Sequence, residues 1–228
     1  MKIKKINLLN PETEIIAQAV KVLHEGKLVV HPTETCYGFA ADVLNQNALE
    51  DLYAAKGRDF NKPVSMMVRS IEEAQKYVEF NEVALRLAER FWPGPVTLVL
   101  PRKAALPVFF NRAQSTLGVR CPDSAIARAL IDGFGGPLTT TSANLSGEPE
   151  AYNVADFLHQ YENFSEGLKN VEIILDGGEL LFKSQDGALS KNPPSTVIGF
   201  EEENENAGPV ILREGALVDE VKHFLSLA

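Results

Sequence analysis

Short apolar runs and helix-spaced apolar positions alternate along this chain. The runs have the length and the β-branching of buried strands, and they cover 27–30, 64–68, 96–100, 116–120, 137–141, 171–175 and 195–200. Between them apolar residues recur every three or four positions, which predicts helices at 11–25, 47–56, 81–92, 122–131, 153–161 and 218–227. Such an alternation of strands and helices is typical of an α/β fold with a mostly parallel sheet.

Turn and cap residues mark where several of these helices begin and end. Asn10 followed by Pro11 predicts an N-cap and a first-turn proline for the first helix, and Ser70 predicts the N-cap of a short helix. Gly57 predicts a left-handed C-cap directly after Lys56, so the helix before it ends in a sharp bend. A cation at such a helix end lies where the helix dipole favours positive charge.

Two stretches, 101–115 and 177–195, show neither kind of periodicity. We expect one domain over residues 1–228. Inside such a domain the segment 179–194 is long for a loop, so we interpret it as a lid or an insertion. The acidic run at 201–208 is expected to be the solvated tip of a hairpin.

Composition indicates an ordinary globular protein and narrows its function. The 228 residues are 45% hydrophobic and 23% charged, which is enough for one sizeable core. The formal net charge of -9 argues against a broadly basic surface, so we expect weak or no direct binding of nucleic acid. Because no apolar window reaches the roughly 20 residues of a membrane-spanning helix, we expect a soluble, cytoplasmic protein without membrane contact.

The sequence contains no familiar motif for a metal site, a nucleophile or a phosphate-binding loop. Cys36 and Cys121 stand alone without zinc-site spacing, and we interpret both as small packing residues. Neither GxxxxGK[ST] nor GxGxxG occurs, so a bound nucleotide must be held in another way. We therefore expect no metal ion held by the protein itself.

A basic cluster and a hydroxyl-rich segment are the first candidates for chemistry. Lys56, Arg58 and Lys62 surround the predicted bend and form either an anion clamp or a solvated helix end, two interpretations that the residues leave open. The segment TTTSANLSG (139–147) follows an apolar strand and includes Ser142 and Asn144. Its polar groups either satisfy turn backbone or, next to the cations, bind phosphate or carboxylate oxygens.

Two arginines end apolar strands, where a guanidinium requires an anion or solvent. For Arg120 the choice is between a structural partner such as Asp123 and a substrate carboxylate held by two hydrogen bonds. Arg213, at the end of PVILR, allows the same two interpretations.

Seven short motifs, each weak alone, together resemble the YrdC-like family of threonylcarbamoyl-AMP synthases. The resemblance runs from about residue 11 to about residue 215 and implies a twisted, mostly parallel mixed sheet flanked by helices, with one large groove. His31 and Phe39 depart from the family's usual residues, and neither is expected to carry chemistry. The motifs are PTETCYG (32–38), KGR (56–58), PGPVT (93–97), GVRCP (118–122), TSANLSG (141–147), STV (195–197) and ILREG (211–215).

The resemblance also implies a reaction and roles for particular residues. Members of the family join L-threonine, bicarbonate and ATP into threonylcarbamoyl-AMP and pyrophosphate, with Mg²⁺ bound mostly by phosphates and water, and a downstream tRNA-modifying complex consumes the product. The implied roles are Lys56, Arg58, Ser142 and Asn144 for the triphosphate, with Lys56 and Arg58 catalytic; Thr33, Thr35, Arg120 and Thr140 for threonine; and Ser195 and Arg213 for the adenylate.

Three other functions compete with this one. An RNA-binding module would suit a positive groove, but the acidic balance and the lack of exposed-aromatic RNA motifs count against it. A carbamoyl-transfer role, as in the hydrogenase-maturing carbamoyltransferases, would bring zinc-finger and acylphosphatase-like segments that this sequence lacks. A diverged YrdC-like paralogue without the activity is disfavoured by the intact KGR and SAN.

Overall fold

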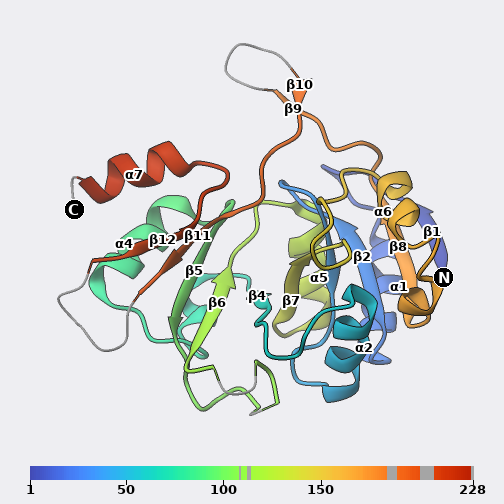
Figure 1. Ribbon diagram of the computed structural model, residues 1–228, viewed down its shortest axis with the longest axis horizontal. Coiled ribbons are helices and arrows are strands. Elements are labelled where there is room, and N and C mark those ends of the chain that lie inside the picture. The colour runs from blue at the N-terminus through green and yellow to red at the C-terminus, as the bar shows by residue number, and fades with distance from the viewer. Residues whose placement is uncertain (108, 112–113, 184–188, 201–207, 227–228) are drawn as a thin grey trace.

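Ten strands form one mixed sheet across the molecule in the computed structural model, which describes all residues except 108, 112–113, 184–188, 201–207 and 227–228 (Figure 1). The strands are β1 (Lys2–Lys5), β2 (Leu28–Pro32), β3 (Tyr37–Ala40), β4 (Ser65–Met67), β5 (Val96–Pro101), β6 (Thr116–Arg120), β7 (Leu138–Ser142), β8 (Val171–Asp176), β11 (Thr196–Gly199) and β12 (Val210–Arg213). Their order across the sheet is β1-β8-β2-β3-β7-β4-β6-β5-β11-β12.

Parallel and antiparallel pairs both occur in this sheet. The parallel pairs are β1 with β8, β8 with β2, β4 with β6, and β5 with β11. Strands β2 and β3 are joined by the short turn 33–36 and pair antiparallel, because a short connection cannot return a strand in the parallel direction. Strand β7 lies antiparallel between β3 and β4 and joins the two halves of the sheet.

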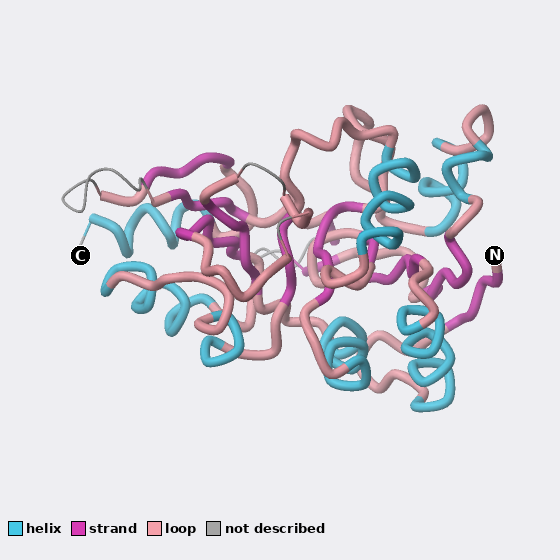
Figure 2. The backbone as a smooth tube through the Cα atoms, turned by 90° about the horizontal axis from the view of Figure 1, so that it is seen from below, coloured by secondary structure: helices cyan, strands magenta, loops and turns pink. Residues whose placement is uncertain are grey.

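Helices cover both faces of the sheet half that contains β2, as Figure 2 shows. Apolar residues of α1 and α5 pack together with Val29 and Ala40 against one face. The opposite face carries Phe39, whose ring contacts Phe157 of α6 edge-on, and it is also covered by α2. The helices are α1 (Thr13–His24), α2 (Gln46–Lys56), α3 (Ile71–Ala74), α4 (Glu82–Phe91), α5 (Ala125–Phe134), α6 (Val154–Gln160) and α7 (Val218–Ser226), with a 3-10 turn at Ser165–Leu168.

The predicted α/β class, with a mixed sheet flanked by helices, is confirmed, as are several predicted caps. The Ser70 side chain accepts a hydrogen bond from the Glu73 amide, and Gly57 ends α2 with a φ of 53°. The cap predicted at Asn10 is wrong. Glu12 precedes α1 instead, because the side chain of Asn7 accepts hydrogen bonds from the amides of Leu9 and Asn10 and thereby holds Asn10 in a turn.

Other boundaries differ from the prediction by a few residues or were missed. The helix expected at 122–131 begins at Ala125, after Ser124, whose side chain accepts from the Ala127 amide, and it continues to Phe134. Strand β1 has the sequence KIKK and lies at a sheet edge with mostly exposed side chains, so it has no apolar run to reveal it. Such lysine-rich edges are common where a strand faces solvent.

Two predictions concern segments that are described in part or hardly at all. In the segment 179–194, strands β9 (Phe182–Lys183) and β10 (Leu189–Ser190) pair antiparallel, and residues 184–188 between them lie outside the described residues. The interpretation as a lid or insertion stays a prediction. The acidic run at 201–208 lies, except for Gly208, outside the described residues.

Candidate functional site

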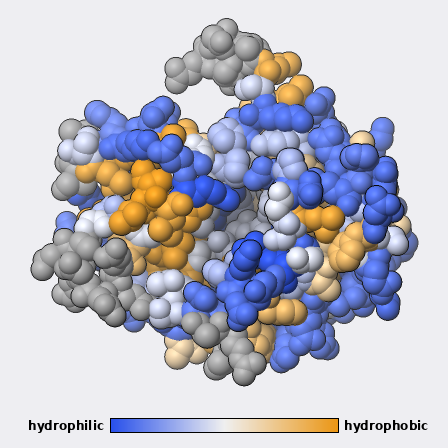
Figure 3. All heavy atoms as spheres, viewed as in Figure 1, coloured by the Kyte–Doolittle hydropathy of each residue, from blue (hydrophilic) through white to orange (hydrophobic). Residues whose placement is uncertain are grey.

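A cavity of about 230 Å³ lies over the middle strands of the sheet. Seven strands contribute to its lining, from β3 through β7, β4, β6, β5 and β11 to β12. Figure 3 shows a hollow near the centre of this face, bordered mainly by hydrophilic side chains. All ten residues that the sequence predicts for the site line this one cavity: Thr33, Thr35, Lys56, Arg58, Arg120, Thr140, Ser142, Asn144, Ser195 and Arg213.

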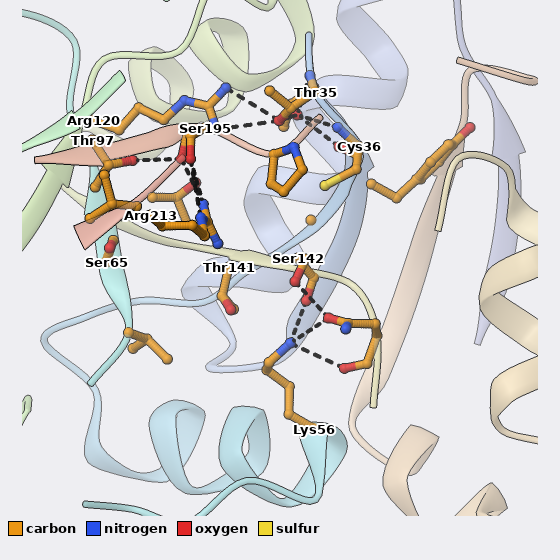
Figure 4. A pocket seen from close by; sticks show the side chains of 18 of the residues that line it. Thr35, Cys36, Lys56, Ser65, Thr97, Arg120, Thr141, Ser142, Ser195 and Arg213 are labelled. Carbon is orange, nitrogen blue, oxygen red and sulfur yellow. Dashed lines mark hydrogen bonds between the residues drawn. The ribbon is translucent and has the colours of Figure 1, made fainter. Parts of the chain in front are cut away.

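Lys56, the last residue of α2, points its ammonium group at the end of β7 (Figure 4). Its Nζ donates hydrogen bonds to the Ser142 carbonyl, to the Asn144 carbonyl at 3.1 Å and to Asn144 Oδ1 at 3.0 Å. The side chain is only 2% exposed. Burial, reinforced by the charge of Arg58, lowers the pKa of Lys56 from 10.5 to about 7.

The segment 142–148 is held around this lysine from both sides. The Ser146 amide donates to the Lys56 carbonyl at 2.8 Å, and the Ser142 hydroxyl donates to Asn144 Oδ1 at 2.6 Å. The Asn144 amide group donates in turn to the Glu148 carbonyl. Lys56 of KGR and Ser142 and Asn144 of SAN therefore form one hydrogen-bonded unit, in which Lys56 fixes the shape of the segment.

Arg58 lies just beyond the bend at Gly57, half-buried at the rim of the cavity. Its Nη2 donates to the Pro63 carbonyl at 2.9 Å and its Nε to the Lys62 carbonyl at 3.3 Å. Within the described residues, no Asp or Glu forms an ion pair with it. The prediction of a clamp of three cations is wrong for Lys62. This residue is exposed and does not line the cavity, and it contacts Arg58 only through its backbone carbonyl.

Arg120 is buried and already has an acidic partner. Its Nη2 lies 2.7 Å from Glu34 Oε1, and both terminal nitrogens lie 3.3 Å from Thr35 Oγ1. Asp123, the structural partner considered from sequence, pairs instead with Arg128 at 3.5 Å. The reason is the fold: the turn 33–36 brings Glu34 to the end of β6.

This pairing limits how Arg120 can hold a substrate. Four of its five N–H groups are used, because Nε also donates to the Gly94 carbonyl at 3.2 Å. A carboxylate gripped by two hydrogen bonds therefore requires Thr35 Oγ1 to release at least one N–H group. The second oxygen of Glu34, Oε2, is buried without a hydrogen-bond partner among the described residues.

The two threonines of the turn between β2 and β3 form a compact hydroxyl pair. Thr33 Oγ1 lies 2.9 Å from Thr35 Oγ1 and donates to the Cys36 carbonyl at 2.7 Å. Thr140 lies on β7, half-buried, and lines the same cavity. The hydroxyl pair and Arg120 thus face one polar side of the cavity.

Ser195 and Arg213 form another part of the lining. Arg213 Nη2 donates to the Ser195 carbonyl at 2.8 Å and to Ser195 Oγ at 3.1 Å. Ser195 Oγ also lies 2.9 Å from Thr97 Oγ1 on β5, and Figure 4 shows these three side chains together. Arg213 therefore has a neutral structural partner in Ser195.

Several residues of this site are not predicted by the sequence pattern. Glu34 and Thr97 stand inside the motifs PTETCYG and PGPVT, but nothing in their own pattern marks Glu34 as the partner of Arg120 or Thr97 as that of Ser195. Cys36 lines the cavity, and burial raises the pKa of its thiol to about 11, which fits the predicted packing residue.

Two further findings concern metals and membranes. Among the residues that the structure describes, no group of three His, Cys, Asp or Glu side chains is placed to hold a metal ion. None of the described helices combines the length and the apolar character required to cross a bilayer.

Comparison with known proteins gives one consistent result. The sequence model of the Sua5/YciO/YrdC family, described as telomere recombination, matches residues 21–215. A Methanocaldococcus jannaschii protein, provisionally named threonylcarbamoyl-AMP synthase, is 35% identical over 95% of this chain and 94% of its own length. The chain spans about half the length of two other curated relatives, the threonylcarbamoyl-AMP synthases of Pyrococcus abyssi (53%) and Bacillus subtilis (54%).

Solved structures agree with the sequence comparison. The crystal structure of P. abyssi Sua5 complexed with L-threonine is 34% identical, with a TM-score of 0.82 over 98% of this chain and 60% of that chain. Escherichia coli YciO is 26% identical, with a TM-score of 0.77 over 94% of this chain and 96% of that chain.

Proposed function

Because this chain belongs to the Sua5/YciO/YrdC family, we propose that it is an ATP-using transferase that condenses L-threonine, bicarbonate and ATP into threonylcarbamoyl-AMP and pyrophosphate. The observation that carries the proposal is the cavity, which gathers all ten implicated residues from positions far apart in the sequence. The length match with the M. jannaschii relative supports the assignment of the whole reaction to a chain of this size.

The charges in the cavity suit this chemistry. In the proposed reaction the threonine amine and bicarbonate give a carbamate and water, a carbamate oxygen attacks the α-phosphorus, and the bond to pyrophosphate breaks. Such a step requires alignment of the reactants and positive charge near the departing oxygens. Arg58 lies at the rim with N–H groups that have no acceptor among the described residues, while Lys56 adds charge and holds Ser142 and Asn144 in position.

Threonine and the adenylate contact different groups of lining residues in this proposal. Thr33, Thr35, Thr140 and Arg120 receive threonine, with its carboxylate taking N–H groups of Arg120 that now contact Thr35. Ser195 and Arg213 contact the adenylate. Of the described lining residues none is Asp or Glu, so Mg²⁺ fits the site as an ion bound mainly by the phosphates and water.

We further propose that the product passes to a separate tRNA-modifying complex in the cytoplasm. The mixed anhydride between carbamate and phosphate is an activated group, and a transferase that forms it needs a partner to accept it. Direct binding of tRNA by this chain is expected to be weak because of its net charge of -9.

One assay tests the proposed function. The purified protein is mixed with threonine, bicarbonate, Mg²⁺ and ATP, and pyrophosphate release is followed together with mass spectrometry of the adduct. Release should require threonine and bicarbonate together, and the adduct should have the mass of threonylcarbamoyl-AMP. Release that is indifferent to threonine would refute the proposal, and no release at all would indicate the diverged paralogue.

A further inference from the structure

One short segment connects the two sides of the cavity. We call residues 191–195 the strap; it runs from β10 toward β11, the orange stretch that descends from the β9–β10 hairpin in Figure 1. On one side the strap meets the turn that contains Thr33 and Thr35, and at its end lies Ser195, which Arg213 contacts.

Asn192 fastens the end of the strap next to β10. Its Nδ2 donates to the Glu34 carbonyl at 3.0 Å, and its own carbonyl accepts a hydrogen bond from the Tyr152 hydroxyl. Neighbouring Lys191 adds two weaker contacts, with its Nζ 5.0 Å from the Tyr152 ring centre and 3.6 Å from Asp156 Oδ2. The strap is thus held at Asn192 by two hydrogen bonds, and toward β11 the Pro194 carbonyl accepts a hydrogen bond from the Ala216 amide at 2.8 Å.

A continuous series of contacts passes through this asparagine. Arg120 pairs with the Glu34 side chain at 2.7 Å, and the carbonyl of the same glutamate accepts from Asn192. Three residues later, Ser195 accepts from Arg213 and contacts Thr97. The residues proposed for threonine and those proposed for the adenylate therefore share one connecting element.

We propose that Asn192 is a positioning residue that couples the two substrate subsites, so that occupation of either one favours binding at the other. The inference rests on the proposed function, because it assigns threonine to the Arg120 side and ATP to the Arg213 side. Threonine that takes N–H groups of Arg120 changes the contacts of the turn 33–36, and the Glu34 carbonyl transmits the change to the strap. A strap fixed in this way places Ser195 and Arg213 for the adenylate.

The coupling has a simple thermodynamic basis. Each ligand must order or shift the same strap, which costs free energy. Because the first ligand to bind already places the strap, the second ligand binds without this cost and therefore more tightly. Linkage requires that the effect be reciprocal: ATP must strengthen threonine binding by the same factor by which threonine strengthens ATP binding. Loss of the Asn192 amide separates the two sides while leaving the direct contacts of each ligand in place.

Calorimetric titration of threonine, with and without a non-hydrolysable ATP analogue and Mg²⁺, measures this coupling. In the unaltered protein we expect the analogue to tighten threonine binding by about 10-fold, a common size for coupling between sites. In Asn192→Ala the enhancement should fall to about 2-fold, while threonine affinity without the analogue changes little. Tyr152→Phe, which removes the second contact of Asn192, should lower the enhancement in the same direction.

A matched control and two outcomes make the test decisive. Asn170→Ala removes an asparagine that bonds Asp51 and Lys27 away from the cavity, and its coupling should equal that of the unaltered protein. Coupling that stays intact in Asn192→Ala overturns the inference, since the ligands then communicate by touching each other. If the unaltered protein binds neither ligand, the proposed function itself fails, which is a different result.

Discussion

The cations of the cavity differ in how many of their N–H groups the protein already uses. Lys56 has all three engaged by oxygens of the segment 142–148, and Arg120 has four of five engaged. Arg58 uses two of five, both on carbonyls that orient it at the rim. By this measure Arg58 is the residue with most capacity to grip a phosphate.

Arg58→Ala should therefore impair the reaction far more than it impairs folding. Charge-assisted hydrogen bonds that strengthen as pyrophosphate leaves contribute roughly 2 to 4 kcal/mol, so turnover should fall by about 30-fold to 1,000-fold. Because the side chain is half-exposed, the melting temperature should change little. Arg58→Lys should restore only part of the activity, since a point charge lacks the two-pronged guanidinium. Steady-state kinetics measure this effect. If Arg58→Ala turns over at nearly the rate of the unaltered protein, Arg58 does not bind the phosphates in the reaction.

Lys56 should make ATP binding depend on pH. Its pKa is lowered to about 7, so near neutral pH the free protein has partly lost this proton, and a bound triphosphate should return it. We expect uptake of about half a proton per bound ATP analogue at pH 7, rising toward one at pH 8. Titrations in two buffers of different ionisation enthalpy measure this uptake.

Lys56→Arg is the control, because arginine stays protonated and the nucleotide's own titration then cancels in the difference. Equal proton uptake in both proteins would show that Lys56 keeps its charge throughout.

The lowered pKa of Lys56 also predicts how the stability of the protein changes with pH. Above pH 7 the unfolded chain holds a proton that the folded chain has released, so the free energy of unfolding should rise between pH 7 and 10.5.

The pair of Arg120 and Glu34 should matter for stability as well as for binding. Both side chains are largely buried, 6% and 14% exposed, so Glu34→Ala leaves a buried guanidinium without its counter-charge. Breaking such a pair costs about 3 to 5 kcal/mol of unfolding free energy. Added threonine should recover part of this loss, because its carboxylate replaces the missing one. Urea unfolding with and without threonine checks both effects, and a loss below about 1 kcal/mol would mean that solvent already screens the pair.

At the scale of the element, the end of α2 sets the direction of both KGR cations. Gly57 has a φ of 53°, and a Cβ atom there would meet nothing within 4 Å, so substitution brings backbone strain without a clash. Gly57→Ala should lower the unfolding free energy by roughly 1 kcal/mol and also reduce turnover, since Lys56 and Arg58 flank the bend.

Gly135 provides a matched control for this prediction. It ends α5 with a φ of 79°, and a Cβ atom there also meets open space, but it does not line the cavity. Gly135→Ala should show a similar loss of stability in chemical denaturation with unchanged turnover. Equal turnover in both variants would show that the bend does not aim the cations.

At the scale of the whole molecule, net charge governs the response to nucleic acid. With a formal charge of -9, the chain should bind tRNA weakly, and the affinity should fall steeply as salt increases. Fluorescence titration with labelled tRNA between low and physiological salt measures this. Tight binding that resists salt would favour the RNA-binding module over the proposed transferase.

Local patterns in the sequence determined the elements and the identity of most polar groups. The apolar runs became β5, β6, β7 and β8, and Gly57 ended α2 as expected, because burial periodicity and left-handed backbone preference act within a few residues. The motif set also predicted ten side chains that line one cavity.

Only the tertiary structure decided which of these groups meet. Glu34 pairs with Arg120, which lies 86 positions later in the chain (120 minus 34). Lys56 donates its hydrogen bonds to Ser142 and Asn144. The order of the strands in the sheet decides which residues come into contact. The sequence pattern of a single strand does not specify which strands will lie beside it. Burial, and with it the lowered pKa of Lys56, follows from the same packing, because desolvation depends on what surrounds a group in space.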